Sequence, residues 1–146
     1  MEKLNEITSA ILQERFGKDN VIALATVENG LPAVRYVNAY YEDGAFYVIT
    51  YALSGKMKQL ELQPAAAIAG DWFTAHGRGE NMGYVGKAEN LALTAKLRSA
   101  FSSWIDNGHT NFSDENTCIL RLALTDGVLF SNGTRYEIDF SESPTA

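Results

Sequence analysis

Two basic residues and a set of hydroxyl side chains carry the most informative chemistry in this sequence. Arg35 lies in a strand-like run of apolar and polar residues, and Lys56 follows a hydroxyl-rich turn. Thr50, Tyr51 and Ser54 precede that lysine at short spacing. A phosphate monoester carries nearly two negative charges, so two cations with several hydrogen-bond donors suit it well. These residues predict a site for a phosphorylated small molecule.

The lysine is also expected at the start of a helix. The segment Ser54-Gly55-Lys56 opens a short helical pattern that ends before Pro64. A helix N-terminus offers free backbone N–H groups and a partial positive charge, which favour a bound phosphate. It is not a nucleotide P-loop, because Met57 stands where that motif needs Ser or Thr. The alternative interpretation is that Arg35 and Lys56 are simply solvated surface residues.

The surrounding pattern predicts a mainly β protein of the α+β class. Tight turns at Asn29-Gly30 and Asp43-Gly44 indicate an antiparallel meander, because these residues tolerate positive φ. Another turn is expected at Asp126-Gly127, and the glycine-rich stretch 77–83 is expected to be a loop. A small barrel is expected, with six to seven short antiparallel strands drawn from the strand-like segments given next and with two to three helices. The expected helices are 3–15, 54–63 and 91–104, and the expected strands are 21–27, 31–41, 45–50, 65–72, 84–88, 117–124, 128–131 and 136–140.

Length and charge narrow the classes of function. With 146 residues, one domain spanning 1–146 is expected, with a disordered tail at 141–146. The net charge of -6 argues against nucleic-acid binding. No apolar run approaches the roughly 20 residues that cross a bilayer, and a signal peptide is not expected. The single cysteine, Cys118, is interpreted as a buried hydrophobic residue, which fits a cytoplasmic protein.

Other motifs in the sequence predict little chemistry. His76 and His109 have no Cys, Asp or Glu at ligand spacing, so no metal site is expected. The Gly-x-Ser-x-Gly elbow of many serine hydrolases is absent. Trp72 is typical of a core or interface residue, although a flat aromatic ligand would also need such neighbours. Asn81, in the glycine-rich stretch, could line a pocket.

Taken in order along the chain, several segments resemble the pyridoxamine 5′-phosphate oxidase-like flavoproteins, which have an FMN-binding split β-barrel. The similar segments are Ala23-Leu-Ala-Thr-Val27 with Gly30 and Pro32, Arg35-Tyr-Val-Asn38, Phe46-Tyr-Val-Ile-Thr50, Ser54-Gly-Lys56, Gln59-Leu60, Gln63-Pro64, 65–69 and Tyr136-Glu-Ile-Asp-Phe140. The resemblance implies a homodimer with two FMN molecules at the subunit interface.

The resemblance also assigns residues to the cofactor. Arg35, Lys56 and Ser54 would hold the FMN phosphate. The backbone of Tyr36, Val37 and Asn38 would run beside the isoalloxazine, and Thr50 and Tyr51 would border the ring and the ribityl chain. Trp72, His76 and Asn81 are candidates for the partner side or the open flavin face.

The sequence departs from pyridoxamine oxidase itself. Gly55 replaces a second basic residue, and the C-terminal region around 130–136 is shorter and lacks arginine-rich substrate motifs. The chain therefore looks more like the small general-stress or nitroimidazole-reductase-like branch of the family. We expect an FMN-dependent oxidoreductase acting on an unidentified small molecule, with NADH or NADPH as a candidate reductant and no side chain assigned as catalytic.

Two other functions remain open at this stage. One is a flavin- or haem-binding sensor or storage protein without turnover, in which His76 or His109 would be the axial haem ligand. The other is a closed barrel that holds an apolar ligand, in which Arg35 and Lys56 would not contribute to binding.

Overall fold

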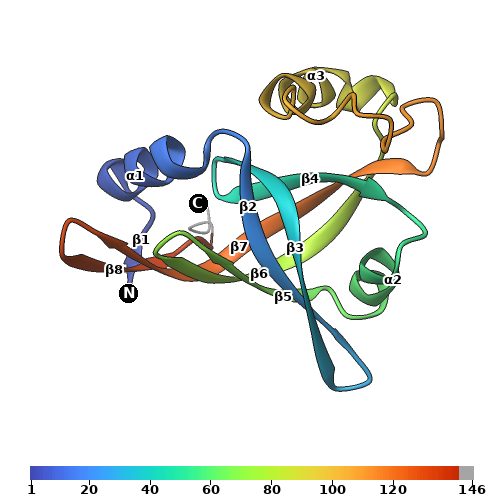
Figure 1. Cartoon of the computed structure of the whole chain (residues 1–146). Coiled ribbons are helices and arrows are strands. Elements are labelled where there is room, and N and C mark those ends of the chain that lie inside the picture. The colour runs from blue at the N-terminus through green and yellow to red at the C-terminus, as the bar shows by residue number, and fades with distance from the viewer. Residues whose placement is uncertain (142–146) are drawn as a thin grey trace.

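In this computed structural model, which describes residues 1–141, the chain forms a β-barrel with helices at its ends and on one side (Figure 1). The elements are β1 (Glu2–Lys3), α1 (Glu6–Phe16), β2 (Asn20–Glu28), β3 (Leu31–Glu42), β4 (Ala45–Tyr51), α2 (Gly55–Leu62), β5 (Ala65–Gly70), β6 (Phe73–Tyr84), a 3₁₀ turn (Ala88–Asn90), α3 (Leu91–Ala100), β7 (Thr117–Ser131) and β8 (Thr134–Asp139).

Six of the strands close into the barrel. Their order is β7-β4-β3-β2-β5-β6, and pairing between β6 and β7 completes the ring. All neighbours in this ring are antiparallel, whereas β8 pairs with the outer part of β7 and the short β1 runs parallel to β8. The predicted α+β split barrel is thus confirmed.

The tight turns follow the sequence closely. Asn29-Gly30 and Asp43-Gly44 both adopt positive φ at both positions, with angles of 52° and 79° in the first turn and 46° and 83° in the second. Asn132-Gly133 does the same between β7 and β8. These are hairpin turns whose twist matches the flanking strands, so the two predicted turns of the meander are confirmed.

Two glycine-based predictions are wrong. The stretch 77–83 belongs to β6 rather than to a loop, and Asp126-Gly127 lies within the continuous strand β7. A Cβ at Gly79 would lie 2.9 Å from Leu60, and one at Gly127 would lie 2.9 Å from the Phe73 ring. These glycines leave room for neighbouring side chains. A sequence pattern alone does not show whether a glycine serves such close packing or a turn.

Several element boundaries also differ from those expected. The first helix begins only at Glu6, because Asn5 caps it by accepting from the N–H groups of Ile7 and Thr8. The strand expected at 84–88 is instead a turn that joins the last residue of β6, Tyr84, to the 3₁₀ turn beginning at Ala88, and α3 ends at Ala100 rather than at 104. Of the tail expected to be disordered, residues 142–146 lie outside the described residues.

The core has two parts. Inside the barrel, α1 places Leu12 and Phe16 against Phe46, whose ring centre is 5.5 Å from that of Phe16. On the outer face of the sheet, α3 packs Leu97 against Ile119 of β7. Figure 1 shows α1 and α2 at opposite ends of the barrel, with α3 above the β4 side. Cys118 is buried, as predicted. Within residues 1–141, none of the helices has the length and apolar character that a membrane crossing requires.

Candidate functional site

The barrel is split between β3 and β4. These two strands pair only where Tyr40–Glu42 meets Ala45–Tyr47. Beyond that point, residues 31–39 of β3 pair only with β2, and residues 48–51 of β4 pair only with β7. Within the described part of the chain, the two facing strand edges therefore carry backbone groups without strand partners, and such groups are available to a ligand. Helix α2 begins next to this opening.

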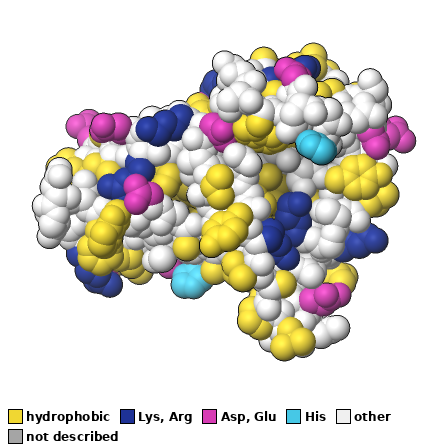
Figure 2. Space-filling model, viewed as in Figure 1, with side chains coloured by type: hydrophobic (Ala, Val, Ile, Leu, Met, Phe, Trp, Pro, Cys, Tyr) yellow, Lys and Arg dark blue, Asp and Glu magenta, His cyan; other side chains and the backbone are white. Residues whose placement is uncertain are grey.

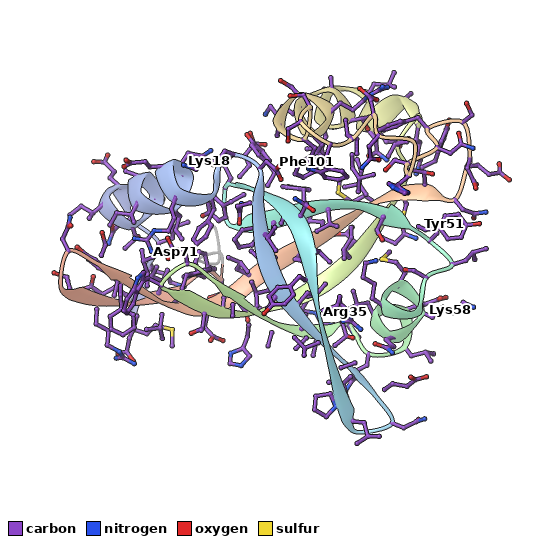
Figure 3. The ribbon with its side chains drawn as sticks, in the orientation of Figure 1. Lys18, Arg35, Tyr51, Lys58, Asp71 and Phe101 are labelled. Carbon is purple, nitrogen blue, oxygen red and sulfur yellow. The ribbon has the colours of Figure 1, made fainter. Side chains whose placement is uncertain are left out.

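Arg35 points from β3 toward α2, on the barrel's inner face. Its guanidinium donates to Thr26 Oγ1 at 2.7 Å, to the Leu24 carbonyl at 3.2 Å and to Gln59 Oε1 at 3.2 Å. Gln59 also accepts from the buried Thr26 hydroxyl. Acceptors on β2 and α2 therefore fix the position of the guanidinium. Figure 3 shows Arg35 beside the helix.

Lys56 brings a second cation to the same place. Burial lowers the pKa of the Lys56 ammonium, and the nearby positive charge of Arg35 lowers this pKa further. Burial also lowers the pKa of the Arg35 guanidinium. Among residues 1–141, neither group has a carboxylate within ion-pair distance. Figure 2 shows basic side chains gathered in a hollow beside β3. Two uncompensated, partly buried cations make a site that favours an anion.

The start of α2 completes this anion site. Ser54 precedes the helix with φ -69° and ψ 159°, but its side chain makes no capping hydrogen bond. Its Oγ is buried and has no partner among the described residues, a state that costs about 1–3 kcal/mol. Nothing lies within 4 Å of a Cβ built on Gly55, so the helix start faces open space. A phosphate oxygen there would satisfy the hydroxyl and the first helical N–H groups.

The remaining predicted residues of β3 and β4 lie along the split. Thr50 and Tyr51 end β4, and the Tyr51 carbonyl accepts from the Ser54 N–H at 3.0 Å. Tyr36 is 80% exposed on the outer face of β3, whereas Val37 packs against the barrel core. The side chain of Asn38 is already engaged, since its Nδ2 donates to Asp19 at 3.0 Å. The side-chain oxygen of Asn38 and its backbone remain for a ligand.

Two predicted residues lie away from this cluster within one chain. Helix α2 leads into the start of β5, but Trp72 follows the end of β5, beside Phe130 and the guanidinium of Arg15. Asn81 accepts from the Gly83 N–H and lines a separate cavity of about 360 Å³ next to Met57. A single chain therefore does not bring Trp72 to the anion site.

Sequence reasoning missed three residues around the cations. Thr26 and Gln59 orient Arg35, and Cys118 faces Lys56 closely enough to influence its pKa. A signal existed for the first two. Thr26 is the polar member of the inward-facing series Ile22, Leu24 and Thr26, and Gln59 lies three residues after Lys56 on the same helical face. The position of Cys118 near Lys56 depends on the pairing of Cys118 with Thr50, which sequence alone does not reveal.

Solved structures with the same fold come from several organisms. A NimC/NimA family protein from Clostridium acetobutylicum is 19% identical, with a TM-score of 0.66 over 88% of this chain and 92% of that chain. An FMN-binding, pyridoxamine 5′-phosphate oxidase-related protein from Nostoc punctiforme is 19% identical, with a TM-score of 0.57 over 92% and 89%. A haem-binding protein from Mycobacterium smegmatis is 18% identical, with a TM-score of 0.61 over 84% of this chain and 54% of that chain.

The sequence also matches the model of a known protein family. A search of the curated proteins gave no match. The sequence model described as pyridoxamine 5′-phosphate oxidase matches residues 9–128, which contain the split, the anion site and all the barrel-closing strands except the end of β7. The chain belongs to the pyridoxamine 5′-phosphate oxidase family.

Proposed function

We propose that the protein is a flavoprotein that binds FMN in the split and acts as an oxidoreductase on a small molecule in the cytoplasm. The observation that carries this proposal is the meeting of Arg35, Lys56 and the unsatisfied Ser54 hydroxyl beside two free strand edges. FMN ends in a phosphate monoester, which suits two cations and a helix start. Its flat ring requires polar backbone groups at one edge, and the split offers these.

In this proposal, the chain binds and orients the cofactor. Arg35 and Lys56 neutralise the phosphate, Ser54 donates its hydroxyl, and Thr50 and Tyr51 border the ribityl chain and the ring. The flavin would supply hydride or electron transfer, for which no side chain has to act as an acid or base. Tyr36, Val37 and Asn38 would present β3 backbone groups to the ring.

The phosphate contacts can be tested by comparing FMN with riboflavin, which lacks the phosphate. Each charge-assisted contact is worth roughly 1.5–3 kcal/mol, so Arg35→Ala and Lys56→Ala should each weaken FMN binding by about tenfold or more. Riboflavin binding should change little. Lys58→Ala is the matched control, because Lys58 is an exposed lysine on the same helix. Equal FMN affinity in the wild type and both variants would contradict the proposal.

Turnover is a separate question from binding. We expect NADH or NADPH to bleach the bound flavin under anaerobic conditions, and a small-molecule acceptor to restore its absorbance. Bound flavin that neither nucleotide reduces would instead support a sensor or storage function. Absorbance near the flavin band, followed without oxygen, separates the two outcomes.

The outer face of the barrel supports a homodimer. Cross-strand partners on β3, β2, β5 and β6 form two rows, Tyr36-Ala23-Ala69-Thr74 and Val34-Ala25-Ala67-His76. The alanines form the floor of a groove of about 370 Å³, and the large side chains of Tyr36 and Val34 stand beside it, 80% and 70% exposed. Figure 2 shows hydrophobic side chains gathered over this face.

A ridge beside a groove is self-complementary under two-fold symmetry. Tyr36 of each copy would enter the groove of the other. The resemblance assigns Trp72 to the partner side of the flavin, so in this dimer Trp72 of one copy would have to reach the split of the other. Sedimentation velocity should show a dimer for the wild type and a monomer for Tyr36→Asp and Ala67→Arg. Leu62→Asp, an exposed site on α2, is the control, and a wild-type monomer at micromolar concentration would contradict the dimer.

One observation favours haem as a second candidate ligand. His76 Nδ1 lies 2.9 Å from Asp126 Oδ1, and Nε2, at the edge of the groove, has no hydrogen-bond partner within residues 1–141. Histidines that bind haem iron or other metals often have such a carboxylate partner. Added hemin should then give a Soret band that His76→Ala removes and His109→Ala retains. Absence of the band in the wild type rules haem out.

A further inference from the structure

A polar cavity lies beside the open end of β4. It has a volume of about 320 Å³ and is lined by Ile49, Thr50 and Tyr51 of β4, by the start of β7, and by the loop that precedes β7. The loop contributes His109, Thr110, Asn111 and Asp114. Because Thr50 and Tyr51 also border the proposed flavin site, the cavity adjoins that site.

The loop is fixed in place by contacts at several points. The Asn116 carbonyl accepts from the Ala52 N–H at 2.7 Å, and the Asn111 carbonyl accepts from the Thr117 hydroxyl at 2.6 Å. Phe112 is held twice, by the Tyr84 hydroxyl on its carbonyl at 2.7 Å and by the Arg98 guanidinium 4.0 Å from its ring centre. The cavity is therefore preformed and does not require a ligand to order its wall.

Hydrogen-bond donors remain free in this cavity. The side-chain oxygen of Asn111 accepts from the Ser113 N–H, and one Asp114 oxygen accepts from the Asn116 N–H. Among residues 1–141, no hydrogen bond uses the His109 ring, the Thr110 hydroxyl or the Asn111 side-chain nitrogen. The free groups are thus mainly donors, which suit carbonyl oxygens, while the Asp114 carboxylate disfavours an anion.

We propose that this cavity binds the second reactant of the enzyme, a neutral planar carbonyl compound of the quinone type, with His109 as its main hydrogen-bonding residue. The inference rests on the proposed function. Reduction of a quinone to its hydroquinone takes two electrons and two protons, which a fully reduced flavin releases when it returns to its oxidised form. His109 and Asn111 hold the carbonyl oxygens and set which acceptors fit.

Duroquinone is a suitable probe, because its ring positions are all methylated and cannot add to a thiol. Its binding is located by NMR from the ring proton signals of the two histidines, and its affinity for the wild type and each variant is measured from the methyl signal of duroquinone itself, both with FMN and without added cofactor. We expect a saturable shift of the His109 signal in both samples, because the cavity is lined by the chain itself. The His109→Ala variant should bind duroquinone about tenfold more weakly, which corresponds to one lost hydrogen bond.

His76→Ala is the matched control and should leave duroquinone affinity unchanged. FMN affinity should be equal in wild type and His109→Ala, which shows that the variant is folded and that the two sites are separate. Duroquinone shifts at His76 instead of His109, or an unchanged affinity in His109→Ala, would overturn the proposal. Loss of FMN binding with duroquinone still bound at His109 would refute the flavin proposal and leave this cavity as a quinone site.

Discussion

Each end of the barrel contains an arginine, and the surroundings of the two guanidinium groups differ. At the α1 end, the Arg15 guanidinium donates to the carbonyls of Asp71 at 3.0 Å and Phe130 at 3.1 Å. At the α2 end, Arg35 also has oxygen acceptors, but a second cation, Lys56, lies close to it. The first arginine closes a turn, whereas the second is part of an excess of positive charge.

Packing differs between the ends in the same way. Near α1, the rings of Phe16, Phe46 and Phe73 fill the interior in edge-to-face and tilted contacts. Near α2, a buried hydroxyl at Ser54 has no partner in the part of the chain that the structure describes, and Gly55 faces open space. The comparison teaches that stability is concentrated at one end and unsatisfied polar chemistry at the other, as expected when only one end binds a ligand.

The largest expected effect is at the closed end. Phe16 is 1% exposed, and Phe16→Ala should lower the free energy of unfolding by about 3–5 kcal/mol through lost burial and a residual cavity. Urea unfolding of the cofactor-free protein measures this. Ile7→Ala, an exposed residue on the same helix, is the control and should change stability little. A small loss for Phe16→Ala would show that the α1 end is not the stabilising one.

The next largest effect is expected at the open end, where a substitution should raise the free energy of unfolding of the cofactor-free protein instead of lowering it. Because burial and Arg35 lower the pKa of Lys56 in the folded state, folding disfavours its charged form. Lys56→Met should therefore stabilise the cofactor-free protein at pH 7 while weakening FMN binding.

The pH dependence of this difference follows from the same shift. A folded pKa below the unfolded value of 10.5 means that the unfolded chain binds more protons. Wild-type stability should then rise relative to Lys56→Met as the pH increases toward 10.5. Urea midpoints of both proteins between pH 7 and pH 10 measure the trend. A difference in stability between the two proteins that does not change with pH would contradict the lowered pKa of Lys56.

A smaller effect is expected at Ser54. Ser54→Ala removes a buried hydroxyl that has no partner among residues 1–141, so the cofactor-free protein should keep its stability or gain slightly. FMN binding should weaken about fivefold, by roughly 1 kcal/mol. Ser102→Ala, an exposed site in the turn that follows α3, is the control for FMN titration. A loss of stability without a change in FMN affinity would assign the hydroxyl to the fold instead.

The smallest effect lies outside both ends, at the β8 terminus. Hydrogen bonds from Ser141 and Lys3 lower the pKa of Asp139 to about 2 from 3.8. The lowered pKa means that this contribution is present above pH 3.8 and is lost as the pH falls through about 2. Asp139→Asn should be slightly less stable than wild type at pH 5, and the two acid-unfolding curves should converge near pH 2.

Much of the fold was predictable because its signals are local. The Asn-Gly and Asp-Gly turns require positive φ, and the strand periodicity of β2 to β4 is regular, so the meander follows from neighbouring residues. The glycines of β6 and β7 wrongly indicated a loop and a turn, because Gly79 and Gly127 make room for the side chains of Leu60 and Phe73, which are distant in sequence. The same limit applied to the site. Residue type alone indicated Arg35, Lys56 and Ser54 as candidates, but the hydrogen bond that Arg35 donates to Thr26 depends on long-range pairing.

The separation of β3 from β4 also affects the fate of the cofactor-free protein. Two bare strand edges facing one gap are a template onto which a foreign extended segment can add. A bound cofactor would block that route, while newly made chains would remain open to it until loaded. Supply of the ligand would then govern how much of the protein survives as well as how much is active.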